Sequence, residues 1–95
     1  MSDQLATNLG ADAVSSSLRR MGGTSHLFVW GAFSGATVTV EVRSITGGTE
    51  TDYVPLWDFE GLTEPGYVQL DTTDVHLQLR TTGGDGSTAV NAKCV

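Results

Sequence analysis

Residues 26–43 read HLFVWGAFSGATVTVEVR and contain the clearest pattern in the chain. Between residues 37 and 43, valine alternates with polar residues. Such period-two alternation of β-branched residues predicts a strand with one buried face. Another apolar run comes before it, and Ser34 and Gly35 lie between the two runs as a turn signal. We therefore expect a β-hairpin at the centre of a small all-β domain.

The length of this turn decides which aromatic side chains lie inside the domain. A two-residue turn puts Phe28 and Trp30 on the exposed side of the hairpin, where they form an interface. A three-residue turn with a bulge instead pairs Phe28 with Val40 and Trp30 with Val38. We favour the bulged register, because it packs both aromatic side chains onto the valine face.

Further strands are predicted along the rest of the chain. Residues 75–80 alternate cleanly, with Val75, Leu77 and Leu79 facing inward, and shorter strands are expected over residues 67–70 and 88–95. Pro55 cannot donate a hydrogen bond to a ladder, so its strand is expected at a sheet edge. These patterns predict a small antiparallel β-sandwich of six to seven strands, with a compact β-barrel as the alternative.

The first 22 residues differ from the remainder. Their apolar stripe is weak and a serine run interrupts it, so a stable helix is not expected. A strand over residues 13–21 is an alternative. We predict that residues 1–22 form an extended N-terminal arm, joined by Gly22 and Gly23 to a β-sandwich domain of residues 23–95.

Composition excludes several classes of function. The chain has 95 residues, with 5 Lys and Arg against 11 Asp and Glu, which gives a net charge of -6. That charge argues against binding to nucleic acid or to anionic membranes. The single cysteine, Cys94, cannot form an internal disulfide and is expected to be a small buried residue. No signal peptide or membrane-spanning run is visible, so we expect a soluble protein made in a reducing cytoplasm.

No pattern in the sequence predicts an enzyme, a metal site or a cofactor. His26 and His76 lack companion ligands at zinc-binding spacing, and no motif arranges Ser, His and Asp as a catalytic triad. The acidic turns at residues 71–74 and 83–86 fit calcium binding and ordinary turn chemistry equally well. Exposed aromatic residues would also suit a carbohydrate, although core packing is the favoured use of large side chains in a small sandwich.

Residues 28–57, FVWGAFSGATVTVEVRSITGGTETDYVPLW, resemble the small β-sandwich proteins of tailed-bacteriophage particles. The resemblance implies a structural role in the virion, as a capsid decoration (cement) or head-fibre protein assembled in the bacterial host cytoplasm. It also implies contact with the major capsid protein or other virion proteins, and a homo-oligomer, with a trimer favoured. The alternative is a carbohydrate- or receptor-binding module of a tail or fibre.

On this hypothesis the N-terminal arm and the sheet edges make the contacts, so a deletion of residues 1–20 should leave a folded domain that no longer attaches. The interface candidates are the apolar and basic residues of the arm together with the aromatic residues: Leu5, Leu9, Val14, Leu18, Arg19, Arg20, Phe28, Trp30, Tyr53, Trp57 and Tyr67.

Overall fold

The computed structural model describes residues 3–20, 23–44, 52–56, 61–72 and 74–95. These residues form strands and turns, and none of them lies in a helix that could span a membrane. The all-β prediction is confirmed. The strands are β1 (Asp3–Leu9), β2 (Leu18–Arg20), β3 (Gly23–Ala32), β4 (Thr37–Ser44), β5 (Val54–Pro55), β6 (Gly66–Thr72), β7 (Val75–Thr82) and β8 (Ala89–Cys94).

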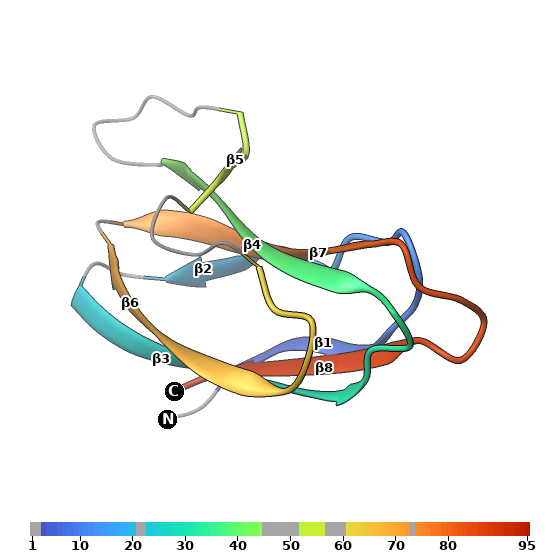
Figure 1. The fold of residues 1–95 in the computed structure, drawn as a ribbon. Coiled ribbons are helices and arrows are strands. Elements are labelled where there is room, and N and C mark those ends of the chain that lie inside the picture. The colour runs from blue at the N-terminus through green and yellow to red at the C-terminus, as the bar shows by residue number, and fades with distance from the viewer. Residues whose placement is uncertain (1–2, 21–22, 45–51, 57–60, 73) are drawn as a thin grey trace.

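The strands form two four-stranded antiparallel sheets that pack face to face (Figure 1). Sheet A has the order β1-β8-β3-β6, and sheet B has the order β2-β7-β4-β5. One long hairpin folded over on itself would contain the strand pairs β1·β8, β2·β7, β3·β6 and β4·β5, and all four are present. The pairs β3·β8 and β4·β7 then join these into two four-stranded sheets. This order is that of a jelly roll, and it confirms the predicted β-sandwich.

The core lies between the two sheets and is built from alternate residues of their central strands. Alternation places every second side chain of a strand on the same face. Side chains that are at most 2% exposed fill this layer: Leu27, Val29, Val38, Val40, Leu70, Leu77, Leu79, Val90, Ala92 and Cys94. The predictions that Cys94 is buried and that residues 75, 77 and 79 of β7 point inward are confirmed.

The predicted central hairpin is wrong. β3 pairs with β6 and β8 in sheet A, whereas β4 pairs with β5 and β7 in sheet B. Ser34 and Gly35 have φ values of 48° and 86°, and Ala36 N donates to Phe33 O over 2.9 Å. This tight turn carries the chain from one sheet to the other instead of joining neighbouring strands.

The predicted burial of Phe28 and Trp30 is therefore also wrong. Their side chains are 42% and 41% exposed, while Leu27 and Val29 of the same strand are buried. The reason is that β3 has one face toward the core, and the aliphatic side chains occupy it. Because β3 and β4 lie in opposite sheets, they form no hairpin. Neither of the two hairpin registers therefore determines which aromatic side chains are buried.

The predicted boundary at residue 22 also needs correction. β1 pairs with β8 and β2 pairs with β7, so the N-terminal segment supplies one edge strand to each sheet. Between them, Ser15 N donates to Leu79 O over 2.8 Å. Leu5 and Ala6 are only 4% and 6% exposed and belong to the core. Residues 3–20 are thus part of the sandwich and do not form a separate arm.

Pro55 lies where the sequence predicts, at a sheet edge. Among the described strands β5 pairs with β4 alone, and Pro55 stands opposite Glu41. Further along the same edge of β4, Leu62 forms two backbone hydrogen bonds of 2.8 Å with Val38 as the chain passes from sheet B to sheet A. This crossing segment closes one side of the sandwich.

Candidate functional site

The outer face of sheet A carries a group of aromatic side chains, which we call the aromatic cluster: His26, Phe28, Trp30 and Tyr67. The first three alternate along β3 and therefore share its outer face. Phe28 stands opposite Tyr67 of β6. Their ring centroids are 5.3 Å apart with an interplanar angle of 20°, and the His26 and Tyr67 centroids are 6.1 Å apart.

Phe28, Trp30 and Tyr67 of the aromatic cluster are exposed to solvent. Tyr67 is 63% exposed, compared with 42% for Phe28 and 41% for Trp30. A stacked aromatic pair contributes about 0.5–1.5 kcal/mol beyond its buried area, which holds the two rings in place on the sheet. Large aromatic side chains exposed together on one face are typical of binding surfaces.

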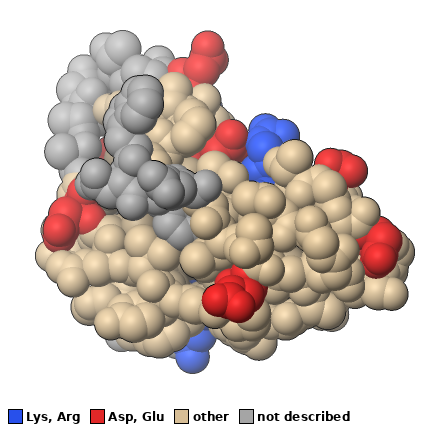
Figure 2. All heavy atoms as spheres, viewed as in Figure 1, with Lys and Arg blue, Asp and Glu red and all other residues tan. Residues whose placement is uncertain are grey.

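Polar side chains surround the aromatic cluster. Lys93 of β8 stands opposite Phe28, and Gln69 of β6 stands opposite His26. At the end of the same face, Thr24 Oγ1 donates to Asp71 Oδ1 over 2.6 Å. Acidic residues are scattered singly over the surface in Figure 2, with few basic residues among them. The cluster is therefore an aromatic surface with hydrogen-bonding groups and two charged side chains, Lys93 and Asp71, at its border.

The outer face of sheet B is polar and is held together by contacts within the chain. Arg43 and His76 are opposite each other on β4 and β7. The Nε and Nη2 atoms of Arg43 lie 3.2 and 3.1 Å from Nδ1 of His76. Because an arginine only donates, Nδ1 is the acceptor in this pair. The guanidinium also lies 5.3 Å from the ring centroid of Tyr53, whose hydroxyl is hydrogen-bonded to that of Ser17.

A second polar group lies beside these residues on sheet B. Glu41 Oε1 accepts hydrogen bonds from Gln78 Nε2 over 2.7 Å and from Arg80 Nε over 3.0 Å. Gln78 is 8% exposed, so its amide depends on this carboxylate for a partner. Arg80 is 47% exposed and Glu41 is 12% exposed, so solvent weakens their ion pair. These contacts stabilise the sheet.

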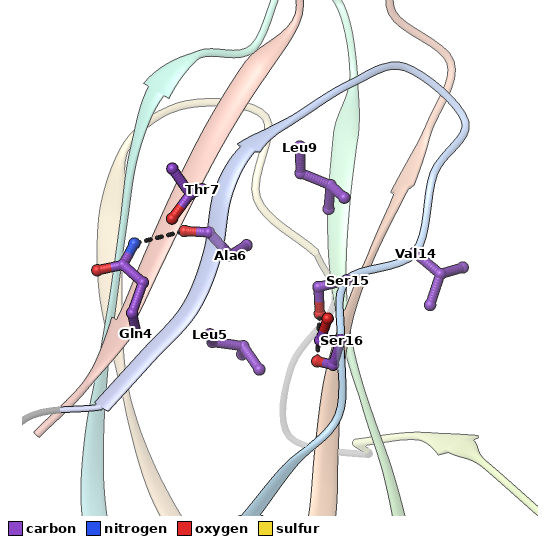
Figure 3. Close-up of a pocket in the computed structure, with 8 residues that line it drawn as sticks. All are labelled: Gln4, Leu5, Ala6, Thr7, Leu9, Val14, Ser15 and Ser16. Carbon is purple, nitrogen blue, oxygen red and sulfur yellow. Dashed lines mark hydrogen bonds between the residues drawn. The ribbon is translucent and has the colours of Figure 1, made fainter.

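A cleft of about 430 Å³ opens where the edges of the two sheets meet on the N-terminal side (Figure 3). β1 forms one wall and the segment after it forms the other. In Figure 3 the side chains of Leu5 and Leu9 lie between β1 and this segment. Both polar and apolar residues line the cleft: Gln4, Leu5, Ala6, Thr7, Leu9, Val14, Ser15 and Ser16.

The acidic turns have structural partners. Asp85 Oδ1 accepts from Ser87 N over 2.7 Å, and Thr88 N donates to Asp85 O over 3.0 Å. Asp71 is the acceptor of Thr24. In the part of the chain that the structure describes, no three His, Cys, Asp or Glu side chains gather as metal ligands would. Turn chemistry therefore accounts for Asp85, whereas Asp71 lies in β6 and accepts its hydrogen bond across a strand pair.

The interface candidates are distributed over several surfaces. Phe28, Trp30 and Tyr67 lie on the outer face of sheet A, whereas Tyr53 lies on sheet B. Trp57 lies outside the described residues. The structure thus brings Tyr67 together with Phe28 and not with Tyr53.

The interface candidates in the N-terminal segment are also spread over different parts of the molecule. Leu5 is in the core, so its assignment as an interface residue is corrected. Leu9 and Val14 line the cleft, and the half-buried Leu18 packs against the core. Arg19 is exposed opposite His76, and Arg20 occupies the β2 position opposite Val75.

The outer face of sheet A also includes three residues that were not among the interface candidates: His26, Gln69 and Lys93. The alternation of β3 places His26 on the face of Phe28, so this residue was predictable once that face was known to be exposed. The positions of Gln69 and Lys93 depend on which strands flank β3, and no local pattern in the sequence records that choice.

Comparisons with known proteins found no counterpart. No protein-family model matches the chain, and no curated protein or solved structure matches it.

Proposed function

We propose that this chain is a non-enzymatic structural protein of a bacteriophage particle, a capsid decoration protein that attaches through the outer face of sheet A. The aromatic cluster is the observation that carries the mode of attachment. Tyrosine, tryptophan and phenylalanine are enriched at the centres of protein interfaces, where truncation of one such residue costs about 2 kcal/mol or more.

The assignment to a phage particle has separate support. It rests on the resemblance of residues 28–57 to the β-sandwich proteins of phage virions. The jelly-roll strand order agrees with it by analogy, since viral capsid domains use this order, as do lectins and other proteins. Because residues 3–20 are part of the sandwich, attachment through a free N-terminal arm is replaced here by attachment through a sheet face.

Cosedimentation with empty shells, assembled from the major capsid protein of the phage that encodes the chain, tests the proposal. The test variant is Phe28→Thr/Trp30→Thr, which keeps strand-forming residues on the exposed face of β3. Loss of about 2 kcal/mol corresponds to roughly a 30-fold weaker binding to the shell. Arg80→Ala on the opposite sheet is the control and should bind as the wild type does.

Either of two results would contradict this proposal. Failure of the wild-type protein to bind shells would overturn the assignment to the capsid. Equal binding by the double variant and the wild type would overturn the role of the aromatic cluster while leaving the capsid assignment in place.

A second candidate function is carbohydrate binding at the same surface. It is favoured by the open ring of Tyr67, stacked with Phe28 and bordered by Gln69, because sugars combine stacking on aromatic rings with hydrogen bonds to polar side chains. Titration with neutral oligosaccharides, followed by tryptophan fluorescence, distinguishes the two. A saturable change that disappears in Trp30→Phe supports the carbohydrate, and no change in the wild type rejects it.

A further inference from the structure

β6 leaves one edge of sheet A unpaired. It pairs with β3 over seven consecutive residue pairs, from Gly23↔Thr72 to Val29↔Gly66, with no register shift. It is the last strand of its sheet, and no described residue pairs with its other edge. Figure 1 shows β6 at the margin of the lower sheet. An exposed edge of this kind presents unpaired backbone donors and acceptors to another strand.

The other three sheet edges carry features that oppose strand pairing. β1 has two register shifts, and Gln4 Nε2 donates to the carbonyl of Ala6 over 2.5 Å. β2 has three residues, and β5 has two residues and includes Pro55. Bulges, prolines and short strands are the usual means of blocking an edge. β6 has seven residues, GYVQLDT, with no proline, lysine or arginine among them.

The sequence of β6 is compatible with antiparallel pairing to its own copy. A strand from Gly66 to Thr72 overlaps its copy completely only when Gln69 stands opposite Gln69 of the second copy. This register places Tyr67 opposite Asp71 of the second copy on the outer face. It also places Val68 opposite Leu70 of the second copy on the inner face, so apolar side chains meet apolar side chains.

Charge also permits this pairing in an acidic protein. Asp71 is the only charged residue of β6, and in this register it faces an uncharged tyrosine. The two Asp71 side chains are four positions apart along the strands, roughly 13 Å at the rise of a β-strand. That separation exceeds the Debye length of about 8 Å at physiological salt, so their repulsion is weak. A partner with an acidic strand would lack this compatibility.

We propose that the chain forms a two-fold symmetric dimer in which β6 pairs antiparallel with β6 of a second copy. The two copies of sheet A then form one eight-stranded sheet, and both aromatic clusters lie on the same face of it. Antiparallel self-pairing uses the same surface on both copies and closes at two subunits. At this edge the structure therefore favours a dimer over the trimer implied by the resemblance.

Residue 69 gives a direct test, because the two-fold axis places this residue opposite itself. Gln69 is exposed, so charged substitutions there are compatible with the folded monomer. Like charges directly opposite each other destabilise a strand pair, and opposite charges stabilise it. Gln69→Lys and Gln69→Glu alone should each raise the dimer dissociation constant about fivefold, and an equimolar mixture of the two should restore a dimer. Thr7→Lys on β1, at the other edge of sheet A, is the matched control.

Sedimentation equilibrium of the full chain measures these constants, with circular dichroism to verify folding. The proposal predicts a two-chain mass for the wild type and for Thr7→Lys. It is overturned by a wild-type mass of one or three chains, by an unchanged dimer in Gln69→Lys, or by a mixture that stays monomeric. Phe28→Thr/Trp30→Thr should dimerise as the wild type does, so the dimer and the role of the aromatic cluster in attachment can fail independently.

Discussion

Substitution of Leu5 by alanine tests whether the N-terminal segment is part of the folded domain. Leu5 is 4% exposed and packs in the core between the sheets. The change removes roughly three carbon atoms from an apolar environment, and at about 0.8 kcal/mol per buried methylene this costs about 2.4 kcal/mol. Leu5 also lines the cleft, where water can fill the vacated space, so the additional cost of a cavity is small. We therefore expect a loss of about 2–3 kcal/mol in the free energy of unfolding.

Urea denaturation followed by far-UV circular dichroism measures this loss. A loss of that size lowers the melting temperature by roughly 10–20 °C for a domain of this length. Val14→Ala is the control, because Val14 lines the same cleft but is 41% exposed, and its loss should stay below about 1 kcal/mol. Equal losses for the two variants would refute the placement of β1 in the core. The structure likewise predicts that deletion of residues 1–20 abolishes cooperative folding, in place of the folded remainder expected from the sequence.

Two further predictions concern close contacts within the sheets, and both are measured as free energies of unfolding in urea. Gly31 has φ +113° and an added Cβ would lie 2.3 Å from a carbonyl oxygen of β8, so Gly31→Ala should cost at least about 3 kcal/mol. Gly23→Ala, at φ +124° with open space around it, should show only the backbone cost of about 1–2 kcal/mol, and equal costs would contradict the steric argument. Glu41→Ala leaves the amide of Gln78 buried without its acceptor and should cost about 1–3 kcal/mol. Arg80→Ala removes only a solvent-exposed ion pair and should cost less than about 1 kcal/mol, so the reverse order would refute the assigned roles.

The outer face of sheet A carries several large side chains, those of the aromatic cluster, that do not contribute to the core of this small sandwich. The core does not need them, because aliphatic side chains of the six longer strands, together with Phe33, fill the space between the sheets. Truncation of Phe28 and Trp30 should therefore affect binding more than stability. This separation of binding from folding makes the proposed attachment surface testable by simple substitutions.

Much of the secondary structure was predictable from local patterns. Valine alternation in residues 37–43 and the apolar alternation in residues 75–80 correspond to β4 and β7, and Pro55 correctly indicated an edge. Alternation is readable because a strand places successive side chains on opposite faces whatever its neighbours are. β2 lies within the strand over residues 13–21 that the sequence offered as an alternative. β1 was missed because Leu5 and Leu9 are two apolar residues among polar ones, and the place of this strand depends on pairing with the distant β8.

The sequence by itself determined the all-β class, the residues that form the main strands, and which side chains of each strand share a face. Only the tertiary structure decided which strands are neighbours. Backbone hydrogen bonds between strands are the same for any pair of sequences, so the pairing of β3 with β6 and β8, rather than with β4, follows from packing of the whole core. That choice placed Phe28 and Trp30 in solvent beside Tyr67, made β1 and β2 part of the domain, and left the outer edge of β6 open.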